Sequence, residues 1–198
     1  MAIGTYVFPS DVLVTGNTTV KGITIQAASK SRTAAIGANA SDTSTGTITI
    51  EDVSLNQTSS GMLNRGLSIQ APNMKPTVTG TNTITTAGID GYGIYLVGSN
   101  DATISGTNTI TTSGADSRGI YLSGSIGAVI VGEVILDSAY RGLQIRDGSV
   151  LSLSPSVLLK DASTTVSIRV DSGNSLTIKS GAQLYLKDDS AYNVCSTD

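Results

Sequence analysis

The chain is built from short runs in which hydrophobic and polar residues alternate, separated by Gly, Asn, Ser or Asp. The clearest runs are residues 102–105, 107–111 and 119–122. Alternation bounded by turn-forming residues predicts β-strands. A helical pattern, with hydrophobic residues at i, i+3 and i+4, is not found over any useful length. Residues 26–40, which are small and polar and include Gly37, are expected to form a loop. The pattern predicts an all-β protein.

Two motifs return along the chain at one spacing. The sequence Gly-Thr-Asn-Thr-Ile-Thr-Thr begins at Gly80 and again at Gly106. The sequence Gly-Ile-Tyr-Leu begins at Gly93 and again at Gly119. Looser copies of the second motif, Gly-Leu-Ser-Ile and Gly-Leu-Gln-Ile, lie upstream and downstream of this pair. The two motifs share a period of about 26 residues, which indicates a repeat architecture.

Each repeat of about 23–27 residues contains three short strands, which cannot close a sheet within one repeat. Stacked coils let each strand pair in parallel with its counterpart in the next coil, about 4.8 Å away. We therefore expect a single-stranded, right-handed parallel β-helix of about seven coils over residues 16–187. Because the ends of a solenoid must be covered, residues 1–15 are expected to form an N-terminal cap or docking segment, and residues 188–198 a C-terminal tail or cap.

This pattern resembles the pectate-lyase-like parallel β-helices, and specifically those of phage tailspikes and fibres and of autotransporter passengers. The two repeated motifs carry the resemblance, which is clear over residues 77–147. It implies the solenoid fold and a virion or cell-surface setting. Motifs of this kind identify a fold better than they identify a function.

The alternation also predicts which side chains form the core. Within Gly-Ile-Tyr-Leu, Ile94 and Leu96 are expected to point inward and Tyr95 outward. The aliphatic residues that should stack on them in the next two coils are Ile120, Leu122, Leu143 and Ile145. In the other motif, inward Ile84 and Ile110 place Asn82 and Asn108 inward as well. We expect a short asparagine ladder there, since the third coil carries no asparagine at that position.

Composition limits the chemistry that this chain of 198 residues can perform. It contains no His and no Trp, one Cys, 12 Lys and Arg against 15 Asp and Glu, and 22 Gly. The lack of His excludes a Ser-His-Asp triad and His-containing zinc sites, and one Cys excludes an internal disulfide. A net charge of −3 argues against nucleic-acid binding. We expect no cofactor, no metal, no signal peptide and no membrane-spanning segment.

Tyrosines at equivalent positions form the first candidate binding feature. Tyr95 and Tyr121 are expected to stack on one outer face, flanked by Ser68 and Gln144. Exposed tyrosine rings can pack on a sugar or contact a protein. The alternative is a cross-coil aromatic pair that only stabilises the sheet.

A row of basic and aromatic residues forms the second feature. Its members, which precede the repeated glycine, are Arg65, Tyr92, Arg118 and Arg141. Such a row can bind a carboxylate-bearing glycan or an acidic partner surface. The alternative is a solvated turn in which Asp116 or Asp137 neutralises the arginines.

Two further patterns are compatible with other functions. A threonine array, formed by the pairs 83/85 and 109/111 with 47/49 as an earlier member, is compatible with ice binding, although β-solenoids are rich in threonine in any case. Three carboxylates that follow the repeat, Asp90, Asp116 and Asp137, are compatible with glycoside hydrolysis. Aspartate is also common in turns for purely structural reasons.

These observations favour a non-enzymatic structural virion protein of a bacteriophage. It would be a capsid decoration, a head fibre or a short tail-fibre or spike subunit that mediates assembly or attachment to the host surface. We expect a homotrimer that assembles with other virion proteins in the host cytoplasm. The first alternative is a carbohydrate-binding adhesin or autotransporter passenger fragment at the bacterial cell surface. The second is a polysaccharide-cleaving enzyme of the tailspike type.

Overall fold

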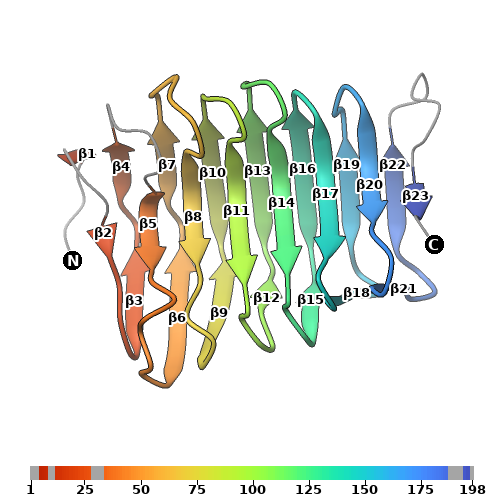
Figure 1. The fold of residues 1–198 in the computed structure, drawn as a ribbon, viewed down its shortest axis with the longest axis horizontal. Helices are drawn as coiled ribbons and strands as arrows, with labels where there is room; N and C mark the ends of the chain where they lie inside the picture. Colours follow the sequence, from red (N-terminus) through yellow and green to blue (C-terminus); the bar gives the residue numbers. More distant parts are fainter. Residues whose placement is uncertain (1–4, 9–11, 28–33, 187–193, 197–198) are drawn as a thin grey trace.

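The structure is a computed structural model that describes residues 5–8, 12–27, 34–186 and 194–196. These residues form 23 β-strands and no helix. The strands wind into a solenoid whose coils stack along the long axis of the molecule (Figure 1). The expected all-β class and parallel β-helix with three strands per coil are confirmed, and the winding is of the right-handed type.

Every third strand along the chain belongs to the same sheet, which produces three sheets, named A, B and C here. Sheet A contains β1 (Thr5–Phe8), β4 (Thr24–Ala27), β7 (Ser54–Gln57), β10 (Thr81–Thr86), β13 (Thr107–Thr112), β16 (Glu133–Ser138), β19 (Leu158–Asp161) and β22 (Gln183–Leu186). Sheet B contains β2 (Val12–Leu13), β5 (Ala34–Ala38), β8 (Arg65–Ile69), β11 (Tyr92–Val97), β14 (Arg118–Ser123), β17 (Arg141–Arg146), β20 (Val166–Val170) and β23 (Val194–Ser196). Sheet C contains β3 (Thr18–Lys21), β6 (Gly46–Glu51), β9 (Met74–Thr79), β12 (Thr103–Ile104), β15 (Ala128–Ile130), β18 (Val150–Leu153) and β21 (Ser175–Ile178).

The number of turns differs slightly from the seven expected. Between residues 34 and 186, where the described chain is uninterrupted, strands β5 to β22 make about six turns. The coils near the N-terminus are longer than those of the clear repeat. The paired residues Lys21 and Glu51 are 30 residues apart, whereas Asn82 and Asn108, inside the clear repeat, are 26 residues apart. Longer connections between strands therefore reduce the number of coils that the chain can form.

The core is a set of aliphatic stacks that run along the solenoid. Ile94 and Leu96 pair with Ile120 and Leu122 in the next coil, as the alternation predicts. These four side chains and their successors Leu143 and Ile145 are buried. Because each coil covers the apolar residues of its neighbours, burial of this surface stabilises the stack as a whole.

The asparagine ladder is confirmed at the start of two strands of sheet A. Nδ2 of Asn82 donates a hydrogen bond to Oδ1 of Asn108 over 3.0 Å, and both side chains are buried. Oδ1 of Asn82 also accepts a hydrogen bond from the backbone N–H of Val53. In the next coil Val134 pairs with Asn108, so the ladder ends there as expected. The amides satisfy buried backbone groups that a hydrophobic residue would leave unpaired.

The prediction of a loop over residues 26–40 is wrong in part. Its second half forms β5, in which all five residues are buried. The small side chains of Ala-Ala-Ile-Gly-Ala pack closely against β8, and so form a strand despite their weak alternation. At the ends, β1 and β2 pair with sheets A and B, as does β23 with sheet B. The rest of the predicted cap segments includes residues 1–4, 9–11, 188–193 and 197–198, which lie outside the described residues.

A glycine at the second position of β8, β11, β14 and β17 breaks the alternation of inner and outer residues. A Cβ atom on Gly93 would lie 2.1 Å from Cγ2 of Ile110 and 2.7 Å from the carbonyl oxygen of Gly119, so position 93 faces the interior. Ile94 is fully buried as well. Two successive residues therefore point inward, and Tyr92 is turned to the outer face, where its ring contacts Tyr95. Strict alternation would have placed Tyr92 inside.

Candidate functional site

The six residues that the sequence singles out for binding lie together on the outer face of sheet B. Pairing of the strands joins the first row, Arg65, Tyr92, Arg118 and Arg141, one residue per coil. The second row runs parallel to it and contains Ser68, Tyr95, Tyr121 and Gln144. Adjacent coils are separated by about 4.8 Å, so each side chain reaches its neighbours along a row.

The tyrosines of these rows form a closed aromatic cluster. The rings of Tyr95 and Tyr121 are stacked, with centroids 5.1 Å apart and planes 4° from parallel, and Tyr92 contacts both of them edge-on. The guanidinium of Arg65 lies 4.1 Å from the centroid of Tyr95. Since Arg65 and Tyr121 belong to coils on opposite sides of Tyr95, both faces of the Tyr95 ring are covered. No open face of this ring is left for stacking on a sugar.

The rings of Tyr92 and Tyr121 are buried as well. Tyr92 and Tyr121 are each only 8% exposed. Burial raises the pKa of both hydroxyls above the usual value for tyrosine, although Arg118 opposes this effect at Tyr92. Both phenols therefore stay neutral at physiological pH. The cluster acts as packed structure that supports the arginines around it.

Arg118 connects the aromatic cluster to the rest of the face. Its Nη1 donates to the carboxylate of Asp90 over 3.2 Å and to the carbonyl oxygen of Asp116 over 2.7 Å. Its Nε donates to Oε1 of Gln144 over 2.8 Å. The side chain is only 14% exposed. Of the carboxylates expected to neutralise this row, Asp116 contributes its backbone instead, and Asp137 lies on the outer face of sheet A.

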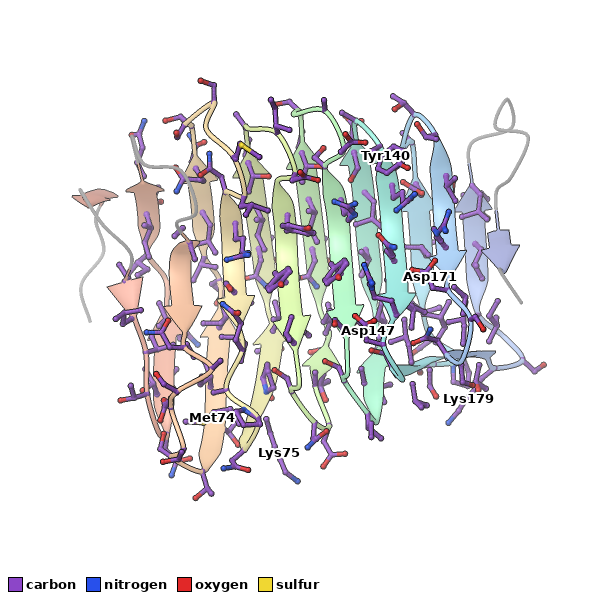
Figure 2. All side chains as sticks on the ribbon, viewed as in Figure 1. Met74, Lys75, Tyr140, Asp147, Asp171 and Lys179 are labelled. Atoms are coloured by element: carbon purple, nitrogen blue, oxygen red, sulfur yellow. The ribbon has the colours of Figure 1, made fainter. Side chains whose placement is uncertain are left out.

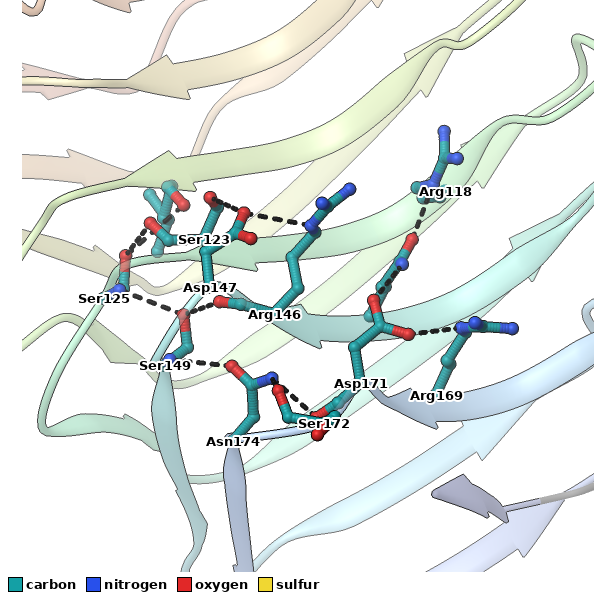
Figure 3. A network of polar contacts seen from close by, with 12 residues as sticks. Arg118, Ser123, Ser125, Arg146, Asp147, Ser149, Arg169, Asp171, Ser172 and Asn174 are labelled. Carbon is teal, nitrogen blue, oxygen red and sulfur yellow. Dashed lines mark hydrogen bonds and ion pairs between the residues drawn. The ribbon is translucent and has the colours of Figure 1, made fainter. Parts of the chain in front are cut away.

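Gln144 is the centre of a polar network that continues into the next coil, and Figure 3 shows the Arg118, Asp171 and Arg169 side chains of this network. Its Oε1 also accepts a hydrogen bond from Nη1 of Arg141, over 3.0 Å, and its Nε2 donates to Asp171 over 2.8 Å. Asp171 in turn pairs with Nε of Arg169, 2.6 Å away. Burial alone would raise the pKa of Asp171, but the hydrogen bonds from Arg169 and Gln144 hold it below its usual value. Asp171 is therefore ionised, and it fixes the Gln144 amide.

An open groove of about 530 Å³ crosses β14, β17 and β20 beside the tyrosine cluster. Its lining consists of Arg118, Arg141, Gln144, Arg146, Asp147, Arg169, Asp171 and Ser172. Figure 2 labels Asp147 and Asp171, which lie near the C-terminal ends of β17 and β20. The sequence reasoning missed Arg146, Arg169 and Asp171. The available signal was that two aliphatic residues flank Arg169 as they flank Gln144, so Arg169 extends the second row by one coil.

The four arginines of the groove are not equally neutralised. Three of them pair with a carboxylate: Arg118 with Asp90 at 3.2 Å, Arg146 with Asp147 at 2.9 Å and Arg169 with Asp171 at 2.6 Å. Arg141 has no such partner among the described residues, and its Nη2 bonds instead to the hydroxyl of Tyr140. Burial lowers the pKa of Arg141, and the nearby charges of Arg169 and Arg118 lower it further, whereas Tyr140 and Asp171 oppose this shift. An anion in the groove would relieve this repulsion.

The threonine array is smaller than the sequence suggested. Thr83 and Thr85 pair with Thr109 and Thr111 on sheet A. The expected earlier member of the array is wrong, because Thr47 and Thr49 belong to β6 of sheet C, where Thr49 pairs with Thr77. In the described chain the paired array on sheet A covers two coils, since Ile135 and Asp137 replace threonine in the next.

The three candidate carboxylates do not converge on one site. Asp90 and Asp116 occupy turns with left-handed backbone, with φ of 52° and 56°, a conformation that aspartate tolerates well. Asp90 is also paired with Arg118. Asp137 is on β16 of sheet A, where it pairs with Thr111 and not with Asp116. The expected position of Asp137 in this series is therefore wrong.

Within the described residues, no group of three or more His, Cys, Asp or Glu side chains is placed to hold a metal ion. None of the described segments forms a helix long and apolar enough to cross a membrane. Comparison with protein-family models, curated proteins and solved structures finds no match. The resemblance to phage tailspikes and autotransporter passengers consequently rests on the repeat pattern and the solenoid alone.

Proposed function

We propose that this protein is a non-enzymatic structural component of a bacteriophage virion, which makes contact through the outer face of sheet B. One observation carries the proposal: all five arginines of the described chain lie on this face, next to the tyrosine cluster. Tyrosine and arginine are the residues most enriched at the energetic centres of protein interfaces. A stiff solenoid displays such a face without the cost of ordering it on binding.

The arrangement of the carboxylates supports a role without catalysis. Retaining glycosidases need two carboxyl groups about 5 Å apart on either side of one bond. Here Asp90 is held by Arg118, Asp116 occupies the equivalent turn of the next coil, and Asp137 lies on a strand of sheet A. The proposal therefore assigns these aspartates to turns and to surface charge.

The outer face of sheet A supports the proposed assembly into a homotrimer. An apolar groove of about 320 Å³ lies over β16, β19 and β22, and Ile135 and Tyr185 are part of its lining. Tyr185 is among the most exposed large hydrophobic residues of the described chain. Exposed apolar surface of this kind marks contacts between proteins. Sheet A would thus join copies, while sheet B binds other virion proteins.

Two measurements test the proposal. Static light scattering on the purified protein is expected to give a trimer mass, and antibody–gold labelling in electron micrographs is expected to mark virions from the protein's source. A protein that stays strictly monomeric and labels no virion would contradict the proposal.

A second candidate function is attachment to a host-surface glycan. The groove on sheet B favours it, since Gln144 and Ser172 add neutral hydrogen-bonding groups to its charges. A glycan array tests it, with the Tyr95→Ala/Tyr121→Ala double variant as one probe. Because both faces of the Tyr95 ring are covered, any glycan binding is expected to depend on the arginines more than on these rings.

A further inference from the structure

One guanidinium in the groove on sheet B, that of Arg141, forms no ion pair with a carboxylate of the described chain, and the charge of Asp171 acts on it only from a greater distance. Arg141 donates to two neutral groups, Oε1 of Gln144 and the hydroxyl of Tyr140. Its Nε is buried and makes no hydrogen bond. The cation–π contact with Tyr140, 4.1 Å from the guanidinium carbon to the ring centroid, fixes the side chain in place. Because the buried Nε has no surface open to the groove, the second N–H groups of Nη1 and Nη2 are the donors with which this positioned cation could bind an anion.

The guanidinium of Arg118 is directed toward the same Gln144 side chain as that of Arg141. Nε of Arg118 and Nη1 of Arg141 both donate to Oε1 of Gln144, so the two positive groups converge on one oxygen. Arg169 belongs to the same groove, one coil further on. Three cations held this close repel one another, and an anion placed between them would be attracted by all three.

The lining restricts the kind of anion. Asp147 and Asp171 are part of the same groove, so a polymer with a charge on every unit, such as polyphosphate or nucleic acid, would meet repulsion at two points. Isolated, planar carboxylates avoid these aspartates and match the fork of a guanidinium with two hydrogen bonds. The groove therefore fits spaced carboxylate groups.

The surroundings favour a polypeptide over a sugar polymer as the bearer of these carboxylates. Sugar rings bind to open aromatic faces, and here the ring of Tyr95 is covered by Arg65 and Tyr121. Buried tyrosine and glutamine side chains beside half-buried arginines, around a polar groove, are typical of the centre of a protein interface.

We propose that the groove over β14, β17 and β20 binds an acidic segment of a partner protein, with Arg141 as the central ligand of an Asp or Glu carboxylate and Arg118 beside it. This inference rests on the proposed function, since it names the kind of partner that the same face of sheet B would contact. Charge complementarity supplies the attraction, since a carboxylate placed beside Arg141 would also lie near Arg118.

The test measures binding of a soluble probe to the full chain. The probe is a decapeptide of alternating glycine and glutamate, titrated at low salt by isothermal calorimetry, and the control peptide carries glutamine in place of glutamate. The acidic peptide is expected to bind and the glutamine peptide is not. Arg141→Gln is expected to raise the Kd by about tenfold or more, because it removes the central charge-assisted hydrogen bonds. Lys179→Gln, which removes an exposed charge beside sheet C (Figure 2), is expected to leave the Kd unchanged.

Circular dichroism checks that each variant is folded. Should Arg141→Gln fail to fold, Arg146→Gln provides the readout, because its side chain is 46% exposed at the rim of the same groove. A Kd that is the same in the wild type and the folded groove variant would overturn the inference. Equal binding of the glutamine peptide would overturn it as well.

Other probes separate the competing occupants. Tighter binding of polygalacturonate or of polyphosphate than of the acidic peptide would overturn the choice of a protein partner. A wild-type oligomer that dissociates in Arg141→Gln would show that the groove joins copies of this chain, and would also overturn it. Labelled virions together with no peptide binding would reject this inference alone, whereas peptide binding without any labelling of virions would reject the proposed function.

Discussion

At the scale of single residues, a tight steric constraint lies at the glycines that follow the first residue of the central sheet B strands. At Gly93 the space for a Cβ atom is already occupied by a side chain and a backbone carbonyl, while φ is not in the left-handed region. The glycine is thus required by the close approach of sheets A and B. It also turns Tyr92 outward, so the arginine and tyrosine row depends on it.

Gly93→Ala is expected to lower the free energy of unfolding by about 3 kcal/mol, because the added methyl group would have to displace Ile110 and the backbone of Gly119. Gly37→Ala on the same sheet is the matched control. A Cβ there would meet its nearest atoms at 3.5 and 3.6 Å, which are ordinary contact distances, so little change is expected. Urea denaturation measures both values, and equal stability of the two variants would contradict this account.

Asp161 is a buried carboxyl on the inner side of β19. Its Oδ1 accepts a 2.9 Å hydrogen bond from the backbone N–H of Ser163, whereas Oδ2 has no partner in the described structure. Burial raises the pKa of Asp161 above its usual 3.8, and the hydrogen bonds from Ser163 only partly oppose this. The ionised form is therefore less stable inside the solenoid than in the unfolded chain.

Because the folded pKa of Asp161 is the higher one, the folded state binds the proton more tightly. The contribution of Asp161 to the free energy of unfolding therefore falls as the pH rises from 3.8 through the folded pKa, and it is most favourable below this interval. Asp161→Asn is expected to remove this loss. The free energy of unfolding of the variant, minus that of the wild type, is therefore expected to increase as the pH rises. Thermal melts across this pH range measure the difference, and parallel curves would rule out the effect.

Between neighbouring strands, the stacked pair Tyr95 and Tyr121 connects β11 to β14 on the outer face. Aromatic pairs of this geometry contribute about 0.5–1.5 kcal/mol beyond the area that they bury. A double-mutant cycle with Tyr95→Ala and Tyr121→Ala is expected to give a coupling energy in this range. Chemical denaturation of the four proteins provides the values. A coupling near zero would mean that the rings stabilise the sheet independently.

The outward positions of strands also show how far a repeat can be extrapolated. The threonines at 83, 85, 109 and 111 occupy equivalent places because their motif recurs in full. Thr47 and Thr49 have the same local pattern but lie in sheet C, because the residues that pair with Thr83 and Thr85 one coil upstream are Ser54 and Asn56 of β7. Local alternation predicts a strand and its inner face, and the pairing between coils decides its sheet.

In the molecule as a whole, each inner coil is covered on both sides, whereas the coils at the ends are covered on one. Among the described strands, β21 and β22 end their sheets and pair only with β18 and β19. Their side chains are mostly exposed or half-buried. Amide exchange over residues 175–186 is expected to be about tenfold faster, or more, than over residues 107–123. Hydrogen-exchange mass spectrometry measures this, and uniform protection would show that the solenoid opens only as one unit.

The sequence by itself determined the solenoid, the inward stacks of Ile94 and Leu96, the asparagine ladder at Asn82 and the rows on sheet B. It did so because two motifs share one period, and parallel pairing in register then stacks like residues on like. The absence of histidine likewise restricts the chemistry that this chain can perform, whatever its fold.

Only the tertiary structure decided what the outer side chains contact. In the folded chain the rings of Tyr95 and Tyr121 stack on each other, and Arg118 forms an ion pair with Asp90. The tertiary structure also assembled a groove from Arg146, Arg169 and Asp171. These contacts depend on side-chain conformation and on coils of unequal length, and neither follows from a repeat that is clear only over residues 77–147. Backbone register is set by a period that can be read from the sequence, whereas pairing between long charged side chains is set by the space that the folded coils leave to them.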